Sequence, residues 1–136
     1  IPVVLPGFNL GGIVATPNGR FLMVAQGTTG RRWRIDLTTK EAVQVDLGAT
    51  SVVNADGIVL RGHTLWVVQN FARQISEVRL DGDWASGQLA SVTPTPANRT
   101  FTTAKIAKGR LLVVDSQFGF APPFPSQDRV VVADLP

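Results

Sequence analysis

The chain has 136 residues, a formal net charge of +3 and no cysteine. The absence of cysteine excludes thiol catalysis, disulfide bonds and cysteine-ligated zinc. No apolar run reaches the roughly 18 residues of a membrane-spanning helix, so no membrane partner is expected. With 44% hydrophobic and 17% charged residues, the composition predicts a globular chain that is long enough to bury a core.

The first predicted strands form a hairpin in residues 12–26, "GIVATPNGRFLMVAQ", whose Asn-Gly pair is a strong turn former. The same phrase recurs as "GIVLRGHTLWVVQN" and as "AKIAKGRLLVVDS", which occupy residues 57–70 and 104–116. Each hairpin is followed by a further apolar strand, and the first two repeats add a fourth. These later strands are predicted at 32–37, 42–47, 75–80, 87–92 and 130–135.

This spacing predicts an all-β fold. Four short antiparallel strands at a period of about 45 residues are typical of a β-propeller blade. A plain β-sandwich is the alternative, but it does not require three copies of one phrase. We therefore expect about three four-stranded antiparallel blades that form half of a β-propeller. The single partial propeller of residues 1–136 divides into blades at approximately 8–50, 51–97 and 98–136, and the last lacks its fourth strand.

An arc of three blades predicts a need for partners. A closed propeller requires about four to eight blades, and unpaired sheet edges are normally covered. We expect either a second chain that supplies the remaining blades or a homodimer that closes the ring. The start at Ile1 without methionine suggests a processed or truncated chain. We expect a secreted or extracytoplasmic location, and the sequon Asn98-Arg99-Thr100 would matter only in a protein that a eukaryote secretes.

Two polar features are interpreted as ordinary surface. Arg31, Arg32 and Arg34 surround Trp33 on a predicted strand, and we interpret them as a solvent-facing outer strand. A nucleic-acid surface would need a basic stripe interleaved with several aromatic residues, so no nucleic-acid partner is predicted. His63, the one histidine, is predicted at a hairpin tip, without a second residue for a His-based mechanism.

The loops at the other end of the blades carry oxygen donors. Asn54 and Asp56 precede an innermost strand, whereas Gln69, Asn70 and Asp115 end second strands. Innermost strands line the central channel, so these side chains should converge at its mouth. Oxygen ligands favour calcium or another hard divalent cation. We predict Asp56 and Asn54 as metal ligands, Asp56 as the catalytic residue, and the other three as contacts of a small-molecule ligand.

Each of these features has a structural alternative. Asp56 with Gly57 can simply close the turn that enters a strand, and Asp115 can accept backbone N–H bonds. The long segment at 118–128, "FGFAPPFPSQD", is typical of a binding loop. Its Phe118 and Phe120 are predicted to contact substrate, although they would equally suit packing over an open blade edge or against a partner.

The phrases "NADGIVLRGHTLWVVQN" and "GIVATPNGRFLMVAQ" resemble blades of the gluconolactonase/regucalcin-like and strictosidine-synthase-like superfamily of six-bladed β-propellers, in its C-terminal half. The resemblance implies a six-bladed ring with calcium at the channel mouth. The ion would be held by an acid or amide before the glycine that starts an inner strand, here Asp56 before Gly57. At that place the first repeat has Gly11, and the third repeat offers Thr103.

The resemblance implies a divalent-metal-dependent hydrolase of lactone or ester substrates. A propeller that binds a small molecule or a protein without catalysis is the alternative, because one fold hosts many functions. A strictosidine-synthase-like lyase or condensing enzyme, with a carboxylate base and no metal, is a second alternative.

Overall fold

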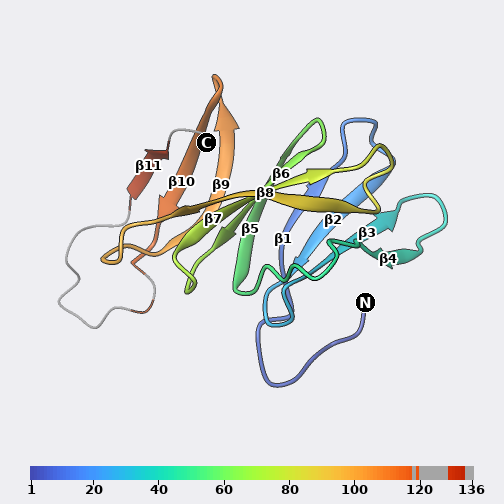
Figure 1. The fold of residues 1–136 in the computed structure, drawn as a ribbon, viewed down its shortest axis with the longest axis horizontal. Helices are drawn as coiled ribbons and strands as arrows, with labels where there is room; N and C mark the ends of the chain where they lie inside the picture. Colours follow the sequence, from blue (N-terminus) through green and yellow to red (C-terminus); the bar gives the residue numbers. More distant parts are fainter. Residues whose placement is uncertain (118, 120–128, 134–136) are drawn as a thin grey trace.

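The computed structural model describes residues 1–117, 119 and 129–133. These residues form three antiparallel sheets (Figure 1). The strands of the first sheet are β1 (Leu10–Ala15), β2 (Phe21–Gln26), β3 (Arg31–Asp36) and β4 (Ala42–Gln44). The second sheet contains β5 (Ala55–Arg61), β6 (Thr64–Gln69), β7 (Gln74–Leu80) and β8 (Gly87–Pro94), and the third contains β9 (Phe101–Ala107), β10 (Arg110–Asp115) and β11 (Arg129–Ala133).

Each strand pairs with its neighbour in the chain, in the orders β1-β2-β3-β4, β5-β6-β7-β8 and β9-β10-β11. The prediction of an all-β fold built from propeller-like blades is thus confirmed. The fourth strand of the first sheet ends earlier than expected, at Gln44. Beyond it the Val45 amide still donates to the carbonyl oxygen of Arg32 in β3, and Asp46 forms a bridge with Ser86, directly before β8 of the second sheet.

No helix in the described part of the chain is long and apolar enough to span a membrane.

The strand β6 is buried on both faces. Leu65 and Val67 are fully buried in the layer between the first two sheets, which also contains Met23 of β2. Trp66 and Val68 point the other way, into a second layer between the second and third sheets. Because side chains alternate along a strand, the run "LWVV" supplies one pair of residues to each interface. This packing of sheet on sheet holds the three blades together.

One face of the first sheet lacks such a neighbour. Ile13 of β1 and Ile58 of β5 hold equivalent positions, since they pair with Val24 and Val67 in matching registers. Ile58 is 6% exposed because the first sheet covers it, whereas Ile13 is 59% exposed. The open face of the arc therefore presents apolar side chains that are buried one blade further on.

The innermost strands β1, β5 and β9 lie next to one another (Figure 1). A Cβ added at Gly12 would lie 2.6 Å from the carbonyl oxygen of Asp56, and one at Gly57 would lie 2.5 Å from the Cα of Thr103. Side chains do not fit at such distances. Glycine at these two positions therefore allows each inner strand to contact the backbone of the next.

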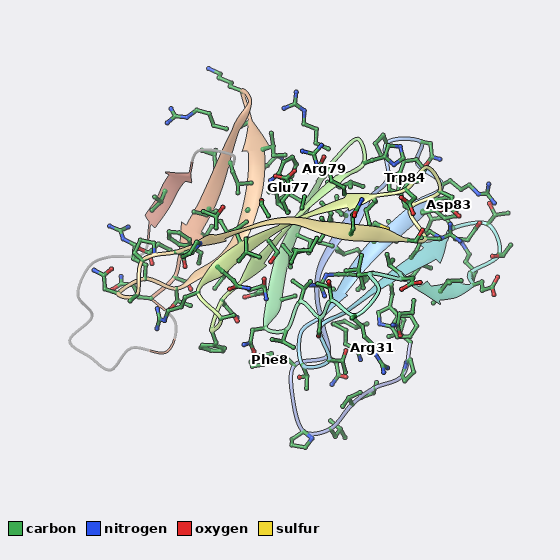
Figure 2. The ribbon with its side chains drawn as sticks, in the orientation of Figure 1. Phe8, Arg31, Glu77, Arg79, Asp83 and Trp84 are labelled. Carbon is green, nitrogen blue, oxygen red and sulfur yellow. The ribbon has the colours of Figure 1, made fainter. Side chains whose placement is uncertain are left out.

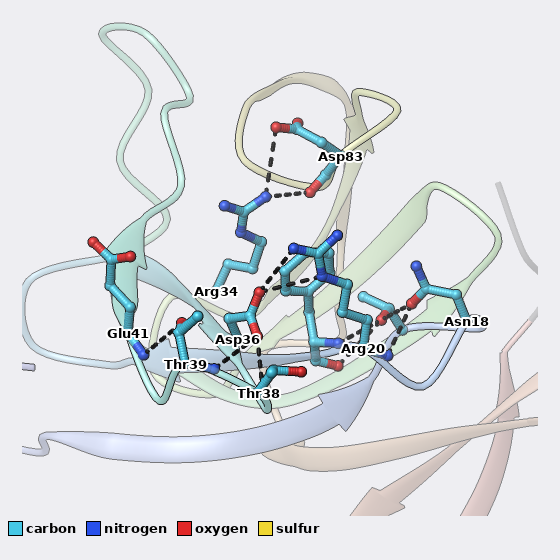
Figure 3. Close-up of polar contacts among 10 residues, drawn as sticks. Asn18, Arg20, Arg34, Asp36, Thr38, Thr39, Glu41 and Asp83 are labelled. Atoms are coloured by element: carbon cyan, nitrogen blue, oxygen red, sulfur yellow. Dashed lines mark hydrogen bonds and ion pairs between the residues drawn. The ribbon is translucent and has the colours of Figure 1, made fainter.

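The hairpin tips at the opposite end of the strands carry a separate polar network (Figure 3). The Asp36 carboxylate accepts bonds from the backbone amides of Thr38 and Thr39 and from Arg20. These bonds lower the pKa of Asp36, and the two bonds from backbone amides have the largest effect. Arg34 donates to the carbonyl oxygen of Asp83 at 2.6 Å, which ties the first sheet to the second.

The interpretation of the arginine cluster as a solvent-facing strand is wrong for Arg32. Arg32 and Arg34 pair with Ala25 and Met23, so both lie on the side of the sheet that faces the core. Arg32 is 1% exposed. His63 agrees with the prediction: it is exposed at a hairpin tip, where its ring stacks on Trp84 with a centroid distance of 4.5 Å.

Candidate functional site

A cavity of about 180 Å³ lies where the inner strands begin. It is formed by the connections between blades and by the β2–β3 and β6–β7 turns, which are the loops predicted to share one end. Figure 2 shows Phe8 at this end and Trp84 at the opposite end of the strands. The lining residues are Phe8, Asn9, Leu10, Gly11, Gly27, Thr28, Asn54, Ala55, Asp56, Asn70, Phe71 and Thr102.

A β-bulge brings Asp56 into the cavity. In β5 the pairing register shifts between Ala55 and Ile58, so Asp56 and Gly57 lie in the bulge. The same irregularity occurs in β1 between Leu10 and Ile13. Bulges redirect side chains next to sites, and here the bulge sets Asp56 at the strand entrance. The equivalent position in the first blade is Gly11, as the sequence predicted.

The equivalent position in the third blade is Thr102, and the prediction of Thr103 is wrong. Leu111 pairs with Ile106 as Leu65 pairs with Leu60, which places Thr102 level with Asp56. Thr102 lines the cavity. Thr103 corresponds instead to Gly57 and lies against it. The three blades therefore present glycine, aspartate and threonine at one structural position.

Asp56 is a partly buried carboxylate held by one amide. The Nδ2 of Asn70 donates to Asp56 Oδ2 at 3.1 Å. Burial raises the pKa of Asp56, because desolvation disfavours the charged form, and the bond from Asn70 lowers it by a smaller amount. A carboxyl group with a raised pKa in a cavity is a stronger base than an exposed aspartate, which suits proton transfer.

Asn54 lies next to Asp56 in the left-handed conformation, with φ 57°, which asparagine tolerates better than most residues. Its backbone amide donates to the carbonyl oxygen of Gly27, and its carbonyl oxygen accepts from the amide of Asn70. These bonds fix the loop across both turns of the cavity. The Asn54 side chain makes no hydrogen bond with the residues described and remains available to a ligand.

The described residues do not by themselves make a complete calcium site. Calcium takes six to eight oxygen ligands, and the side chains that line the cavity offer the Asp56 carboxylate, the Asn54 amide and the hydroxyls of Thr28 and Thr102. The Oδ1 atoms of Asn9 and Asn70 already accept bonds from the amides of Val4 and Phe71. In the part of the chain that the structure describes, no group of three or more His, Cys, Asp or Glu side chains could hold a metal.

Gln69 and Asp115 lie outside the cavity, in a framework that repeats in each blade. Gln69 donates to the carbonyl oxygen of Val53 at 2.7 Å and accepts from Ser76. Gln26 donates in the same way to the carbonyl oxygen of Pro2. Asp115 is fully buried and pairs with Arg99 at 3.1 Å. Each of these side chains, at the end of a second strand, fastens the segment that leads into the inner strand.

Two aromatic residues line the cavity that the sequence did not single out. Phe8 is 70% exposed and Phe71 is 44% exposed. Phe71 directly follows the predicted contact Asn70, and this adjacency was the signal that could have identified it. The predicted contacts Phe118 and Phe120 lie outside the described residues.

Comparisons with known proteins bear on the fold alone. No protein-family model matches this chain, and no curated protein matches its sequence. Among solved structures, hydrazine synthase of Kuenenia stuttgartiensis is similar, with a TM-score of 0.68 and 15% sequence identity. The match covers 98% of this chain and 35% of that chain, so this chain spans about a third of the length of its structural neighbour.

Proposed function

We propose that the cavity around Asp56 binds a small ester or lactone and that Asp56 acts as the general base of its hydrolysis. The observation that carries this proposal is the half-buried Asp56 carboxylate, whose pKa is raised by burial, at the mouth of a cavity of about 180 Å³. Among the lining residues, Asp56 is the one ionisable side chain.

The arrangement suits a ligand with an apolar body and a polar reacting end. Phe8, Leu10 and Phe71 provide apolar lining, whereas Asn54, Asp56 and Thr102 provide polar groups near the bulges. The bond from Asn70 occupies Oδ2 of Asp56, and no described residue bonds to Oδ1. In the proposed reaction, Asp56 takes a proton from a water that attacks the ester carbonyl. The acyl C–O bond then breaks, Asp56 returns the proton to the leaving alcohol oxygen, and Asn70 keeps the carboxyl group oriented.

A divalent cation belongs to this proposal only in a larger ring. Asp56 and Asn54 would be its ligands from this arc, and further blades would add the remaining oxygen donors. Such an ion would polarise the substrate carbonyl. Removal of metal with EDTA tests this part: an unchanged rate after removal would discard the ion and leave the role of Asp56 intact.

The blades that complete the ring are also part of the proposal. Ile13 is exposed at a position where its equivalent Ile58 is buried, so the open face suits another blade of the same kind. The solved neighbour, of which this arc matches 35%, provides an example of a longer chain with such an arc. Native mass spectrometry is expected to show a second chain or a second copy; a stable lone monomer of 136 residues would contradict this.

The pH dependence of hydrolysis tests the base directly. Asp56 must be ionised to accept a proton, so the rate is expected to rise with pH through its pKa. Burial raises that pKa, and the rise should therefore occur at higher pH than for an exposed aspartate. Asn70→Ala removes the bond that favours the ionised form, and it should shift the rise to still higher pH.

The measurement is kcat/KM against pH for a panel of lactones and aryl esters, with the Asn70→Ala variant measured in parallel. A rate that is independent of pH in the wild type, or an unshifted profile in the variant, would contradict the assignment of Asp56 as base.

A binding site without catalysis is the second candidate. It is favoured by the absence, among the described lining residues, of a second ionisable group to act as acid or to stabilise an oxyanion. In that case the small molecules of the panel would bind to the cavity without turnover. Calorimetry on the same panel distinguishes the two functions.

A further inference from the structure

A second cavity, of about 220 Å³, lies at the end of the first sheet where β3 begins. The turn between β2 and β3 separates it from the cavity around Asp56. Gly27 and Thr28 line the cavity around Asp56, whereas Thr29 and Gly30 line the second cavity. Its remaining walls are the start of β3 and the segment 44–51. Figure 2 shows Arg31 at this end of the first sheet. The two cavities have no lining residue in common, so the second is a separate feature.

Arg32 lines this cavity and is almost fully buried, with 1% of its surface exposed. Its Nη1 donates to the carbonyl oxygen of Arg31 at 2.7 Å, and its Nη2 donates to that of Val52 at 2.9 Å. Its Nε has no partner among the described residues. Arg32 takes part in none of the ion pairs found among the described residues. The buried charge is thus met by backbone dipoles alone.

A buried charge without a counter-charge is unfavourable, and such charges are normally paired. Desolvation lowers the pKa of Arg32 to about 10, so the guanidinium still carries its charge at neutral pH. The segment that covers it is tightly placed, because a Cβ on Gly30 would lie 2.3 Å from the Oγ of Ser51. The chain therefore keeps a cation in a place where no described carboxylate pairs with it directly.

We propose that the second cavity binds a small oxyanion, a phosphate or carboxylate group, that supplies the counter-charge for Arg32. Guanidinium N–H groups fit such oxygens, and Nη1 and Nη2 each keep a second N–H beyond the bonds that they make to the carbonyl oxygens of Arg31 and Val52. Thr50 also lines the cavity and its hydroxyl is available as a donor, whereas the hydroxyls of Thr29 and Ser51 already donate to Gln26 and to the Thr29 carbonyl oxygen. A volume of about 220 Å³ exceeds the roughly 10–15 Å³ that a cavity needs to hold one water, so there is room for a small anion with its hydration.

Asp46 is the one acid on the cavity wall. Its Oδ1 accepts a bond from the amide of Gly48 at 2.8 Å, and its charge opposes the approach of an anion. Asp46→Asn keeps an oxygen for that bond and removes the charge. The variant should therefore bind an oxyanion more tightly than the wild type does, which a merely structural role of the loop would not produce.

The test uses the purified protein in its native assembly, titrated separately with inorganic phosphate and with acetate at constant ionic strength, against chloride. Isothermal titration calorimetry and the thermal midpoint are the readouts. At least one of the two oxyanions is expected to bind and to raise the midpoint, and their comparison identifies the preferred class. Arg32→Met should weaken binding at least about tenfold, and Asp46→Asn should tighten it several-fold.

Arg61→Gln is the matched control, because Arg61 is an exposed arginine at the opposite end of the strands. This variant should bind the oxyanion with the affinity of the wild type. The proposal is overturned if neither oxyanion binds the wild type, or if Arg32→Met binds as tightly. Should Arg32→Met fail to fold, an unchanged affinity of Asp46→Asn would overturn it. Failure of hydrolysis at Asp56 would leave these results unaffected, since the two cavities are separate.

Discussion

Asp56→Asn is expected to lower kcat/KM for the best ester or lactone substrate by at least about 100-fold, because general-base catalysis contributes roughly 10²–10⁴-fold. The amide has nearly the shape of the carboxylate and can still accept the bond that Asn70 donates to Oδ2. It cannot accept the proton of an attacking water. The loss should therefore appear in the rate rather than in the fold.

The stability of this variant provides a second readout. The pKa of Asp56 is raised in the folded chain, so the native state binds this proton more tightly than the unfolded state does. Ionisation of Asp56 then destabilises the native state as pH rises through that pKa. At neutral pH Asp56→Asn removes this penalty, and its thermal midpoint should equal or exceed that of the wild type.

Glu41→Gln is the control for Asp56→Asn, because its exposed acid lies away from the cavity and neither rate nor midpoint should change. A variant Asp56→Asn that keeps the wild-type rate would remove Asp56 from the proposed reaction.

Gly57→Ala is expected to destabilise the protein by about 1–3 kcal/mol, the usual cost of overpacking in a close-packed interior. The added Cβ would lie 2.5 Å from the Cα and 2.7 Å from the Oγ1 of Thr103. Because the nearest atom belongs to the backbone, β5 and β9 must move apart. The substitution also displaces the bulge that contains Gly57 and Asp56, and the cavity should lose ligand affinity along with stability.

Gly82→Ala is the matched control for Gly57→Ala. No atom lies within 4 Å of the Cβ position at Gly82, so its effect should stay within about 0.5 kcal/mol, as is usual for surface substitutions. Urea unfolding of the three proteins measures the difference. Equal midpoints for Gly57→Ala and the wild type would mean that the inner strands do not require this close contact.

The fold was accessible from the sequence because local and repeated signals agree. Apolar runs of strand length, turn formers between them and a period of about 45 residues all indicate the same blade. The position of Asp56 could be predicted for a similar reason, since the residue before the glycine of an inner strand lines the cavity. The shorter β4 was not accessible, because the bridge that follows it joins Asp46 to Ser86, a residue far away in the sequence that directly precedes β8.

The side-chain directions at the site could not be predicted from alternation alone. A bulge changes the count between paired strands, and for this reason Thr103 was chosen where Thr102 lies. Gln69 has a polar side chain at the end of a strand, yet this side chain donates to the carbonyl oxygen of Val53 instead of facing the cavity. Arg32 was assigned to solvent because arginine is rarely fully buried, and its position depends on the segment that covers it.

The bulge position has a consequence for how such an arc of blades could acquire a different cavity chemistry. Each blade repeats the same backbone bulge, and a buried amide or acid ends its second strand. The residue at the bulge position differs between the blades: it is Gly11, Asp56 or Thr102. One substitution at Thr102 would thus add an acid beside Asp56 while the backbone that carries it stays the same. Substitutions at the bulge positions can therefore change the polar groups of the cavity in one blade at a time, in evolution or by design.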